Sequence, residues 1–212
     1  MATFIDRLDA GERLADKLNK YKNAAGIVLA IPRGGVPVGY VVARNLGLPL
    51  DLLLTKKIGH PSNKEYAIGA VSLTDRYVVP HADVSQAYIE EETERVRARL
   101  LEMQQKFREG RPLTALKGQI LIIVDDGIAT GNTLMAAIGM LRRQEPARIV
   151  VAVPVAPSDS IQRLKDVADE VVCLHIPGNF YGVGAFYDNF DQVSDETVLE
   201  YIDSYQHEFG GK

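Results

Sequence analysis

Two adjacent carboxylates, Asp125 and Asp126, lie between an aliphatic run and a small, hydroxyl-rich turn in the segment ILIIVDDGIATGNTLMAAIGML, residues 120–141. The aliphatic run is short and rich in β-branched residues, which predicts a buried parallel strand, and TLMAAIGML predicts the helix that follows it. In open α/β sheets, ligands bind at the carboxyl ends of such strands. The pattern therefore indicates a ligand site formed by both acids and the turn.

The turn after the acids combines small residues with hydroxyls and helix-start amides. Gly127, Ala129 and Gly131 let the backbone approach a ligand closely, and Thr130 and Thr133 add hydroxyls. Such a nest of amides favours a phosphate, whereas the acids are natural acceptors for neutral ribose hydroxyls. The order of acids and nest predicts a ribose 5-phosphate ligand. An acidic turn that only caps a helix is the alternative, and the ATP pattern GxxxxGK[ST] does not fit because no lysine follows the glycine.

The motif VDDGIATGNT resembles the phosphoribosyl-diphosphate signature of type I phosphoribosyltransferases. The resemblance implies that Asp125 and Asp126 bind the ribose 2- and 3-hydroxyls. It also implies that the 5-phosphate is held by the backbone and hydroxyls of the loop residues Ala129, Thr130, Gly131, Asn132 and Thr133. The ligand would be 5-phosphoribosyl 1-diphosphate (PRPP).

A second segment, AIPRGGVPVG at residues 30–39, falls where this family has its diphosphate loop. By that resemblance Arg33, Gly34 and Gly35 present amides to the diphosphate, and the bond from Pro32 to Arg33 is the candidate for a cis peptide at a non-proline residue. A dinucleotide-binding turn is the rival interpretation. It fits poorly because the GxGxxG spacing is missing and Pro37 interrupts it.

A third segment, LTKKIGHPSNKEYAIGAV, resembles the strand and flexible loop of the adenine and orotate enzymes. The resemblance implies that Lys57, with Lys56 and Lys64 as further candidates, neutralises the departing diphosphate while the loop Ile58 to Glu65 excludes water. A lysine pair at a strand end is equally compatible with a solvent-facing role.

A fourth segment, HIPGNFYGVGAFYDNF, resembles the hood of hypoxanthine-guanine enzymes, where an aromatic ring stacks on the base. Phe180 and Tyr181 match the aromatic, and Asp188 matches an acid that contacts the base edge. These three residues are the candidates for base binding, although a small aromatic core is the alternative. Ala129 stands where the hypoxanthine-guanine enzymes carry a loop acid, so that proton-handling role is not filled here.

The whole pattern resembles a group of predicted phosphoribosyltransferases, and the resemblance covers nearly the entire chain. The shared motifs span residues 6–11, 32–38, 57–61, 67–71, 124–131, 152–157 and 183–190. The implied fold is α/β, the type I phosphoribosyltransferase fold, with a mostly parallel central sheet flanked by helices. One domain over residues 1–212 is expected, with a small hood built from about 1–22 and 175–212.

Strands alternate with helices along the chain, as a parallel sheet covered on both faces requires. Helices are predicted over Asp9–Tyr21, Val36–Leu46, Val84–Glu109 and Ser194–Phe209, and strands over Ile27–Ile31, DLLLTKKI, ARIVVAVPVA and EVVCLHI. The strand DLLLTKKI is expected to end on its two lysines. AIGAVSL and RYVVP predict a short antiparallel pair.

Composition limits the other classes of protein. With 24 basic and 28 acidic residues the net charge is −4, which argues against general affinity for nucleic acid. No apolar run is long enough to cross a bilayer and the first residues have no secretory pattern, so a cytoplasmic location is expected. Similar proteins are commonly dimers, so a homodimer is a candidate assembly.

The resemblance implies transfer of ribose 5-phosphate from PRPP to a nitrogen nucleophile, with release of diphosphate. Mg²⁺ is the expected cofactor, held mainly through PRPP oxygens and close to Asp125 and Asp126. Arg33 and Lys57 would supplement its charge, and Asp126 is also a candidate acceptor for the nucleophile's proton. A non-catalytic PRPP-binding regulator and a hydrolytic use of the same pocket are the alternatives.

Overall fold

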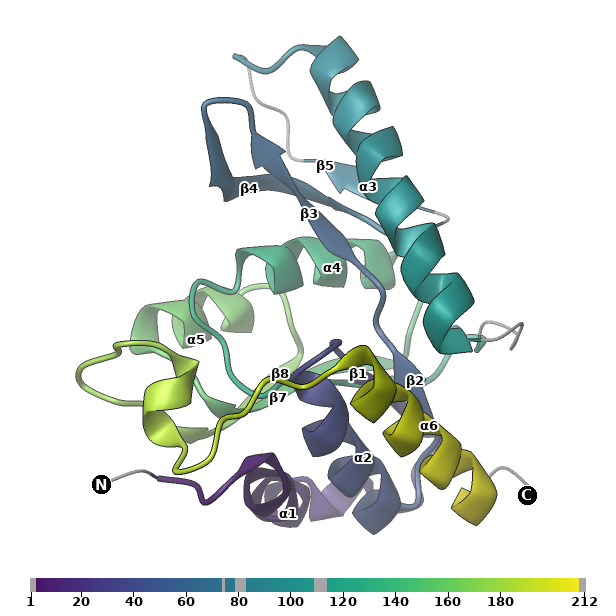
Figure 1. Ribbon diagram of the computed structural model, residues 1–212, viewed down its shortest axis with the longest axis vertical. Coiled ribbons are helices and arrows are strands. Elements are labelled where there is room, and N and C mark those ends of the chain that lie inside the picture. The colour runs from purple at the N-terminus through teal and green to yellow at the C-terminus, as the bar shows by residue number, and fades with distance from the viewer. Residues whose placement is uncertain (1–2, 74, 79–82, 109–113, 210–212) are drawn as a thin grey trace. The chain divides into compact units, whose positions relative to one another are not determined.

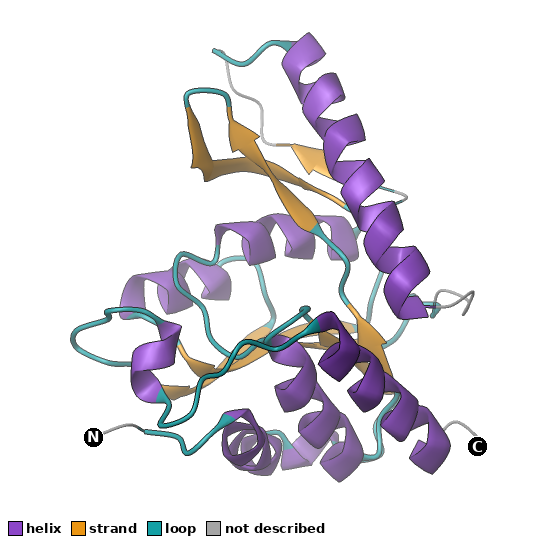
Figure 2. Cartoon of the chain, viewed as in Figure 1, coloured by secondary structure: helices purple, strands orange, loops and turns teal. Residues whose placement is uncertain are grey.

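The computed structural model describes residues 3–73, 75–78, 83–108 and 114–209 (Figure 2). The chain divides into two compact units. Unit 1 comprises Met1–Leu53, Leu116–Thr130 and Pro146–Lys212, and unit 2 comprises Leu54–Ala115 and Gly131–Glu145. The single-domain organisation expected from the sequence stays a prediction.

Unit 1 contains a five-stranded sheet in the order β2-β1-β6-β7-β8 (Figure 1). Its strands are β1 (Gly26–Ala30), β2 (Leu50–Leu52), β6 (Ile120–Val124), β7 (Arg148–Val155) and β8 (Glu170–His175). All neighbouring strands run parallel, and Val124 is level with Ala30 on one side and Ala152 on the other. The predicted strand at Ile120–Val124 is confirmed, and it lies at the centre of the sheet.

Helices flank this sheet, so the predicted α/β class is confirmed. Unit 1 contains α1 (Arg7–Lys17), α2 (Gly35–Leu46), α5 (Ser158–Lys165) and α6 (Asp195–Phe209), with short 3-10 turns η1 (Asn19–Tyr21) and η2 (Val183–Phe186). The connections β1-α2-β2 and β7-α5-β8 step in opposite directions along the sheet. Because such crossovers are right-handed, α2 and α5 lie on opposite faces (Figure 1).

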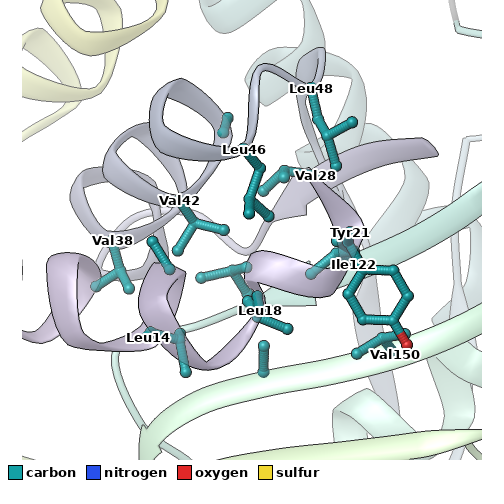
Figure 3. Packing of buried hydrophobic residues seen from close by; sticks show 14 of the residues in the cluster. Leu14, Leu18, Tyr21, Val28, Val38, Val42, Leu46, Leu48, Ile122 and Val150 are labelled. Carbon is teal, nitrogen blue, oxygen red and sulfur yellow. The ribbon is translucent and has the colours of Figure 1, made fainter. Parts of the chain in front are cut away.

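A hydrophobic core lies between the sheet and the helices α1 and α2, which cover one of its faces (Figure 3). Leu14 of α1 and Leu18, which caps the end of that helix, meet Val38 and Val42 of α2 over buried strand residues such as Ile122. The spacing of four residues places both members of each pair on one side. This packing fixes α2, whose first residue, Gly35, is the second glycine of the predicted diphosphate loop.

The helix ends follow local capping chemistry. Asp6 caps α1, because its Oδ1 accepts the backbone N–H groups of Leu8 and Asp9 at 2.9 Å each. The helix therefore begins at Arg7, earlier than the predicted start at Asp9. Gly47 ends α2 in the left-handed region with φ of 63°, as its glycine predicts.

Unit 2 contains an antiparallel sheet in the order β3-β4-β5, with β3 (Lys56–His60), β4 (Asn63–Val71) and β5 (Arg76–Val78). The helix α4 (Asn132–Arg142) packs against this sheet, and α3 (Gln86–Arg108) contacts β3 and β4. The predicted pairing of AIGAVSL with RYVVP is confirmed from Arg76 to Val78. The remaining residues of RYVVP, and the predicted helix end at Glu109, lie outside the described residues.

Two predictions in this region are wrong. The strand that contains Asp51 ends at Leu52, and the two lysines open the separate strand β3, where Lys57 pairs with Ala70. The expected loop Ile58 to Glu65 is mostly a hairpin, whose turn is Pro61 and Ser62. Two turn residues suffice to join antiparallel strands, so the polar residues around them occupy strand positions.

Removal of a side chain from the unit 1 core should be strongly destabilising. Leu18 is fully buried, and Leu18→Ala is expected to lower the free energy of unfolding by about 2–5 kcal/mol because it leaves a cavity. Urea denaturation followed by circular dichroism measures this. Leu8→Ala is the matched control, since Leu8 on α1 is 40% exposed and its truncation should change stability by under about 1 kcal/mol. Equal losses would contradict the described packing.

Candidate functional site

The loops that follow β1 and β6 meet at the carboxyl edge of the parallel sheet. The two strands are neighbours, and the Ile31 N–H donates to the Val124 carbonyl at 2.9 Å. Asp125 and Asp126 follow β6 directly, and the predicted diphosphate loop follows β1. The peptide bond between Pro32 and Arg33 is cis, as the sequence predicts.

Glycine at positions 34 and 35 allows these two loops to touch. A Cβ added at Gly34 would lie 2.0 Å from Asp126 Oδ2, and one added at Gly35 would lie 2.9 Å from the Asp125 Cα. Both distances are shorter than real Cβ atoms show, so a side chain at either position would force the acid pair or the loop to shift. Glycine at these positions allows the acid pair and the diphosphate loop to form one surface without such a shift.

Asp126 is held by an arginine from the amino-terminal segment. Arg7 Nε donates to Asp126 Oδ2 at 2.9 Å, and the two side chains are 12% and 14% exposed. The same guanidinium donates to the Asp191 carbonyl at 2.8 Å and lies 3.9 Å from the centre of the Phe190 ring. A single side chain thus joins the first helix, the acid pair and the carboxyl-terminal segment.

Burial makes the charges of the acid pair costly. It raises the pKa of the Asp125 carboxyl well above its usual value, and the charge of Asp126 raises it further. Burial also raises the pKa of Asp126, while the hydrogen bond and charge of Arg7 act in the opposite direction. The Asp126 N–H donates to Asp125 Oδ1 at 2.9 Å, which satisfies one oxygen of the deeper acid. The pair is therefore suited to bind hydroxyl donors or a cation.

Tyr187 supports the backbone of the acid pair. Its hydroxyl donates to the Asp126 carbonyl at 2.6 Å, and its buried ring packs between Phe4 and Phe190. Burial raises the pKa of the tyrosine, so the hydroxyl stays a donor at neutral pH. Phe4 also pairs with Tyr187 through a backbone bridge, which joins the two terminal segments that the sequence assigns to the hood.

A cavity of about 360 Å³ opens beside the acid pair in unit 1. Its lining consists of Arg7, Arg33, Gly34, Asp126, Phe190, Gln192 and Val193. Three of these, Arg33, Gly34 and Asp126, are predicted site residues that the fold brings together. The guanidinium of Arg33 also reaches Asp195, with 3.7 Å between Nη1 and Oδ1.

The predicted phosphate loop is tied to neighbouring elements of unit 1 up to Thr130. The Ile128 N–H donates to the Val155 carbonyl at 2.9 Å, and Ser160 Oγ donates to the Ala129 carbonyl at 2.6 Å. Gly131, in unit 2, adopts the left-handed region with φ of 68° and precedes α4. Asn132 and Thr133 are the first two residues of that helix, which begins one residue before the predicted start at Thr133.

The remaining predicted residues lie elsewhere. Lys57 is on β3 in unit 2. Phe180 stacks on Phe186 with 5.8 Å between ring centres, Tyr181 is 86% exposed, and the exposed Asp188 donates its backbone N–H to the Phe4 carbonyl. Among the described residues, the lining of the 360 Å³ cavity includes Phe190 from this segment but not these three.

Arg7, Phe190 and Gln192 line the cavity although no role for them is predicted from the sequence. The motif at residues 6–11, which recurs in the group that the chain resembles, contains Arg7 and is a signal for it. No local pattern indicates its partner Asp126, which lies 119 residues away.

Two further properties of the described residues bear on function. They contain no group of three or more histidine, cysteine, aspartate or glutamate side chains arranged to hold a metal ion. None of the helices within the described part of the chain has the length and apolar character needed to span a membrane.

The fold is that of an α/β protein, with the candidate site at the carboxyl ends of parallel strands. The family described as phosphoribosyl transferase domain matches residues 5–191. The protein called "Putative phosphoribosyl transferase MT0597", from Mycobacterium tuberculosis (strain CDC 1551 / Oshkosh), is 42% identical over 219 residues, covering 99% of this chain and 48% of that protein. The chain thus spans about half the length of this curated relative.

Solved structures agree with the assignment. The crystal structure of TT1426 from Thermus thermophilus has 42% identity and a TM-score of 0.89, and the match covers 95% of this chain and 98% of that one. A hypoxanthine phosphoribosyltransferase from Staphylococcus aureus, at 12% identity and a TM-score of 0.51 over 85% of this chain and 79% of that one, shares the fold. The chain belongs to the phosphoribosyl transferase domain family, and the sequence-based identification of a type I phosphoribosyltransferase is confirmed.

The Arg7 to Asp126 ion pair should contribute strongly to stability. Arg7→Gln leaves a shielded carboxylate without its partner, which is expected to lower the free energy of unfolding by roughly 2–4 kcal/mol. Asp126→Asn added to Arg7→Gln should restore part of that loss. A double-mutant cycle by urea denaturation measures the coupling.

Arg13→Gln is the matched control for this cycle. Arg13 pairs with Asp9 at the surface and is 49% exposed, so its loss should change stability by under about 1 kcal/mol. A loss for Arg7→Gln no larger than that for Arg13→Gln, or strict additivity in the cycle, would contradict the inferred role of the ion pair.

Proposed function

We propose that this chain binds PRPP and transfers its ribose 5-phosphate to a nitrogen nucleophile, releasing diphosphate. The observation that supports this most is the acid pair at the carboxyl end of β6, with Gly34 against Asp126. Paired carboxylates beside a glycine loop offer acceptors for ribose hydroxyls and backbone donors for phosphates within one surface. The family to which the chain belongs favours the same reaction.

Each part of PRPP has a counterpart among the proposed site residues. Asp125 and Asp126 would bind the ribose hydroxyls, and Ala129 to Thr133 would bind the 5-phosphate. Arg33, Gly34 and Gly35 would bind the diphosphate, whose charge the cationic Arg33 compensates. Lys57, in unit 2, is proposed to neutralise charge on the departing diphosphate.

The reaction breaks the bond between C1 and the diphosphate oxygen and forms a bond from the nucleophile's nitrogen to C1, with inversion. Positive charge develops on the ribose ring in an oxocarbenium-like transition state, and negative charge develops on the leaving group. The protein's contribution is to position the two reactants and to stabilise the leaving charge. Asp126 is a further candidate to accept the nucleophile's proton.

We propose Mg²⁺ as the cofactor, because the donor chemistry of the site fits it. Asp125 and Asp126 supply hard carboxylate oxygens whose charges burial leaves poorly compensated, and the hydrogen bond from Arg7 is to Oδ2 of Asp126. The ion would take its other oxygens from the ligand's ribose and diphosphate. When bound, it would supply electrostatic stabilisation of the leaving diphosphate.

The nucleophile is proposed to be a nucleobase. Phe180 and Tyr181 offer aromatic faces for stacking, and Asp188 offers an acceptor for a base N–H. Phe190 and Gln192 add an aromatic ring and a carboxamide at the 360 Å³ cavity, so the carboxyl-terminal segment presents two sets of groups of the kind that bases contact.

Calorimetric titration with PRPP tests the proposal directly. Binding is expected in the presence of Mg²⁺ and should weaken when the metal is removed with a chelator. The double variant Asp125→Asn and Asp126→Asn should lose roughly a hundredfold in affinity, because two charged acceptors for hydroxyls are replaced. Unchanged binding by a folded double variant would refute the assignment of the acids.

A diphosphate-release assay with a panel of nucleobases then separates the possible functions. Release that depends on one base supports transfer, and release without any base supports hydrolysis. Tight PRPP binding with no release under either condition would favour the regulatory alternative over catalysis.

Glycine at position 34 should be essential for ligand binding. The methyl group of Gly34→Ala would displace Asp126, since its Cβ would lie 2.0 Å from Oδ2, and PRPP affinity should fall at least about tenfold. Gly178→Ala is the matched control, because no heavy atom lies within 4 Å of its added Cβ. Equal affinities for the two variants would show that contact between the loop and the acid is not needed for binding.

A further inference from the structure

The helix α5 makes two side-chain contacts with the predicted phosphate loop, and neither residue is assigned a role by the family's motifs. Ser160 is 2% exposed, and its Oγ donates to the Ala129 carbonyl at 2.6 Å. One turn further along the helix, Arg163 Nη2 donates to the Thr130 carbonyl. Two successive loop carbonyls are therefore bound by side chains on the same face of one helix.

A third hydrogen bond holds Ile128, the residue before Ala129, to the same part of the chain. The Ile128 N–H donates to the Val155 carbonyl at 2.9 Å, at the end of the strand that leads into α5. Three consecutive residues, Ile128 to Thr130, are thus bonded to the segment that runs from β7 through α5. We call Ser160 and Arg163 the α5 brace.

The planarity of the peptide bond gives the brace a consequence for ligand binding. In a trans peptide the C=O and the next residue's N–H point in opposite directions. With the carbonyls of Ala129 and Thr130 directed at α5, the N–H groups of Thr130 and Gly131 point away from α5. Two successive amides aimed the same way form the type of nest that binds an anion.

The backbone at the end of the loop is consistent with this nest. Gly131 has φ of 68° and ψ of 0°, which is the left-handed conformation that a nest of consecutive amides uses. The residue's lack of a side chain makes that conformation accessible. The carbonyl contacts to α5 thus orient the amides of Thr130 and Gly131, and the conformation of Gly131 sets how the next amide, that of Asn132, follows them.

We propose that Ser160 and Arg163 are positioning residues for the 5-phosphate of PRPP. They act through the loop peptides and make no contact with the ligand: by binding two carbonyls on one side, they hold two amides in place for the phosphate on the other. The inference rests on the proposed function, because it takes the loop to be the 5-phosphate site. The inference adds that two side chains on α5 order the loop before the ligand binds. A loop that is already ordered lowers the entropic cost of binding.

The test compares two fragments of PRPP. Calorimetry with ribose 5-phosphate and with inorganic diphosphate, both with Mg²⁺, is carried out on the unmodified chain, Ser160→Ala, Arg163→Met and Arg163→Lys. Ser160→Ala should weaken ribose 5-phosphate roughly three- to tenfold, the range for one neutral hydrogen bond, and leave diphosphate unchanged. Because this variant alters no charge, such a loss cannot come from a changed electrostatic field.

Arg163 adds a graded series to the comparison. Arg163→Met should weaken ribose 5-phosphate, and Arg163→Lys should recover part of the loss because it retains a charged donor. Ser158→Ala and Lys165→Met are matched controls, since both residues are exposed on α5, and they should leave both ligands unchanged. Equal weakening of both ligands, or none, in Ser160→Ala and Arg163→Met would overturn the brace.

Hydrogen exchange of the ligand-free protein gives a second measurement that needs no ligand. Ser160→Ala and Arg163→Met should increase amide exchange in the peptide that contains residues 125–133, whereas Ser158→Ala and Lys165→Met should not. Unchanged exchange in both brace variants would overturn the inference even if their affinities fell. Failure of the unmodified chain to bind either PRPP or ribose 5-phosphate would instead overturn the proposed function. That outcome can be told apart from failure of the α5 brace, because it is observed without any variant.

Discussion

The arrangement of unit 1 depends on holding Asp126 where water is largely excluded. A carboxylate so placed needs compensation, which Arg7 supplies at the side chain. The backbone of the same residue is held by Tyr187 at its carbonyl and by Asp125 at its N–H. Loss of a partner of buried Asp126 would lower the stability of the fold. The segments that carry Arg7 and Tyr187 must therefore lie where these side chains can reach Asp126. The amino-terminal helix and the carboxyl-terminal segment are both positioned by this requirement.

The parallel sheet makes that arrangement possible. Because β1 and β6 are neighbours in register, their following loops emerge side by side, and Gly34 and Gly35 then let the two loops meet without an intervening side chain. The core that fixes α2 lies on one face of the sheet, and the brace from α5 acts from the other. Helices on both faces of the sheet thus support the loops that follow β1 and β6, which are held by hydrogen bonds such as that from Ser160 to Ala129.

The strongly patterned parts of this structure could be predicted from the sequence, and the parts set by long-range contact could not. The aliphatic run before Asp125, the helix after Gly131 and the cis bond before Arg33 are local features, and all three were expected where they occur. Polar composition misled the prediction at Ile58 to Glu65, because Asn63 and Lys64 are exposed like the turn residues before them although they lie on β4. The contacts of Arg7 with Asp126 and Phe190 depend on chain segments far apart in sequence, so no periodicity or spacing could indicate them.

The position of Arg7 joins two parts of the site that are usually considered separately. Its guanidinium binds the acid proposed for the ribose and also covers the ring of Phe190, which belongs to the hood segment. A change in the charge or position of Asp126 alters its interaction with Arg7, and the same guanidinium is bound to the Asp191 carbonyl. The acid pair and the carboxyl-terminal segment are thereby linked, since neither can rearrange around Arg7 without a consequence for the other.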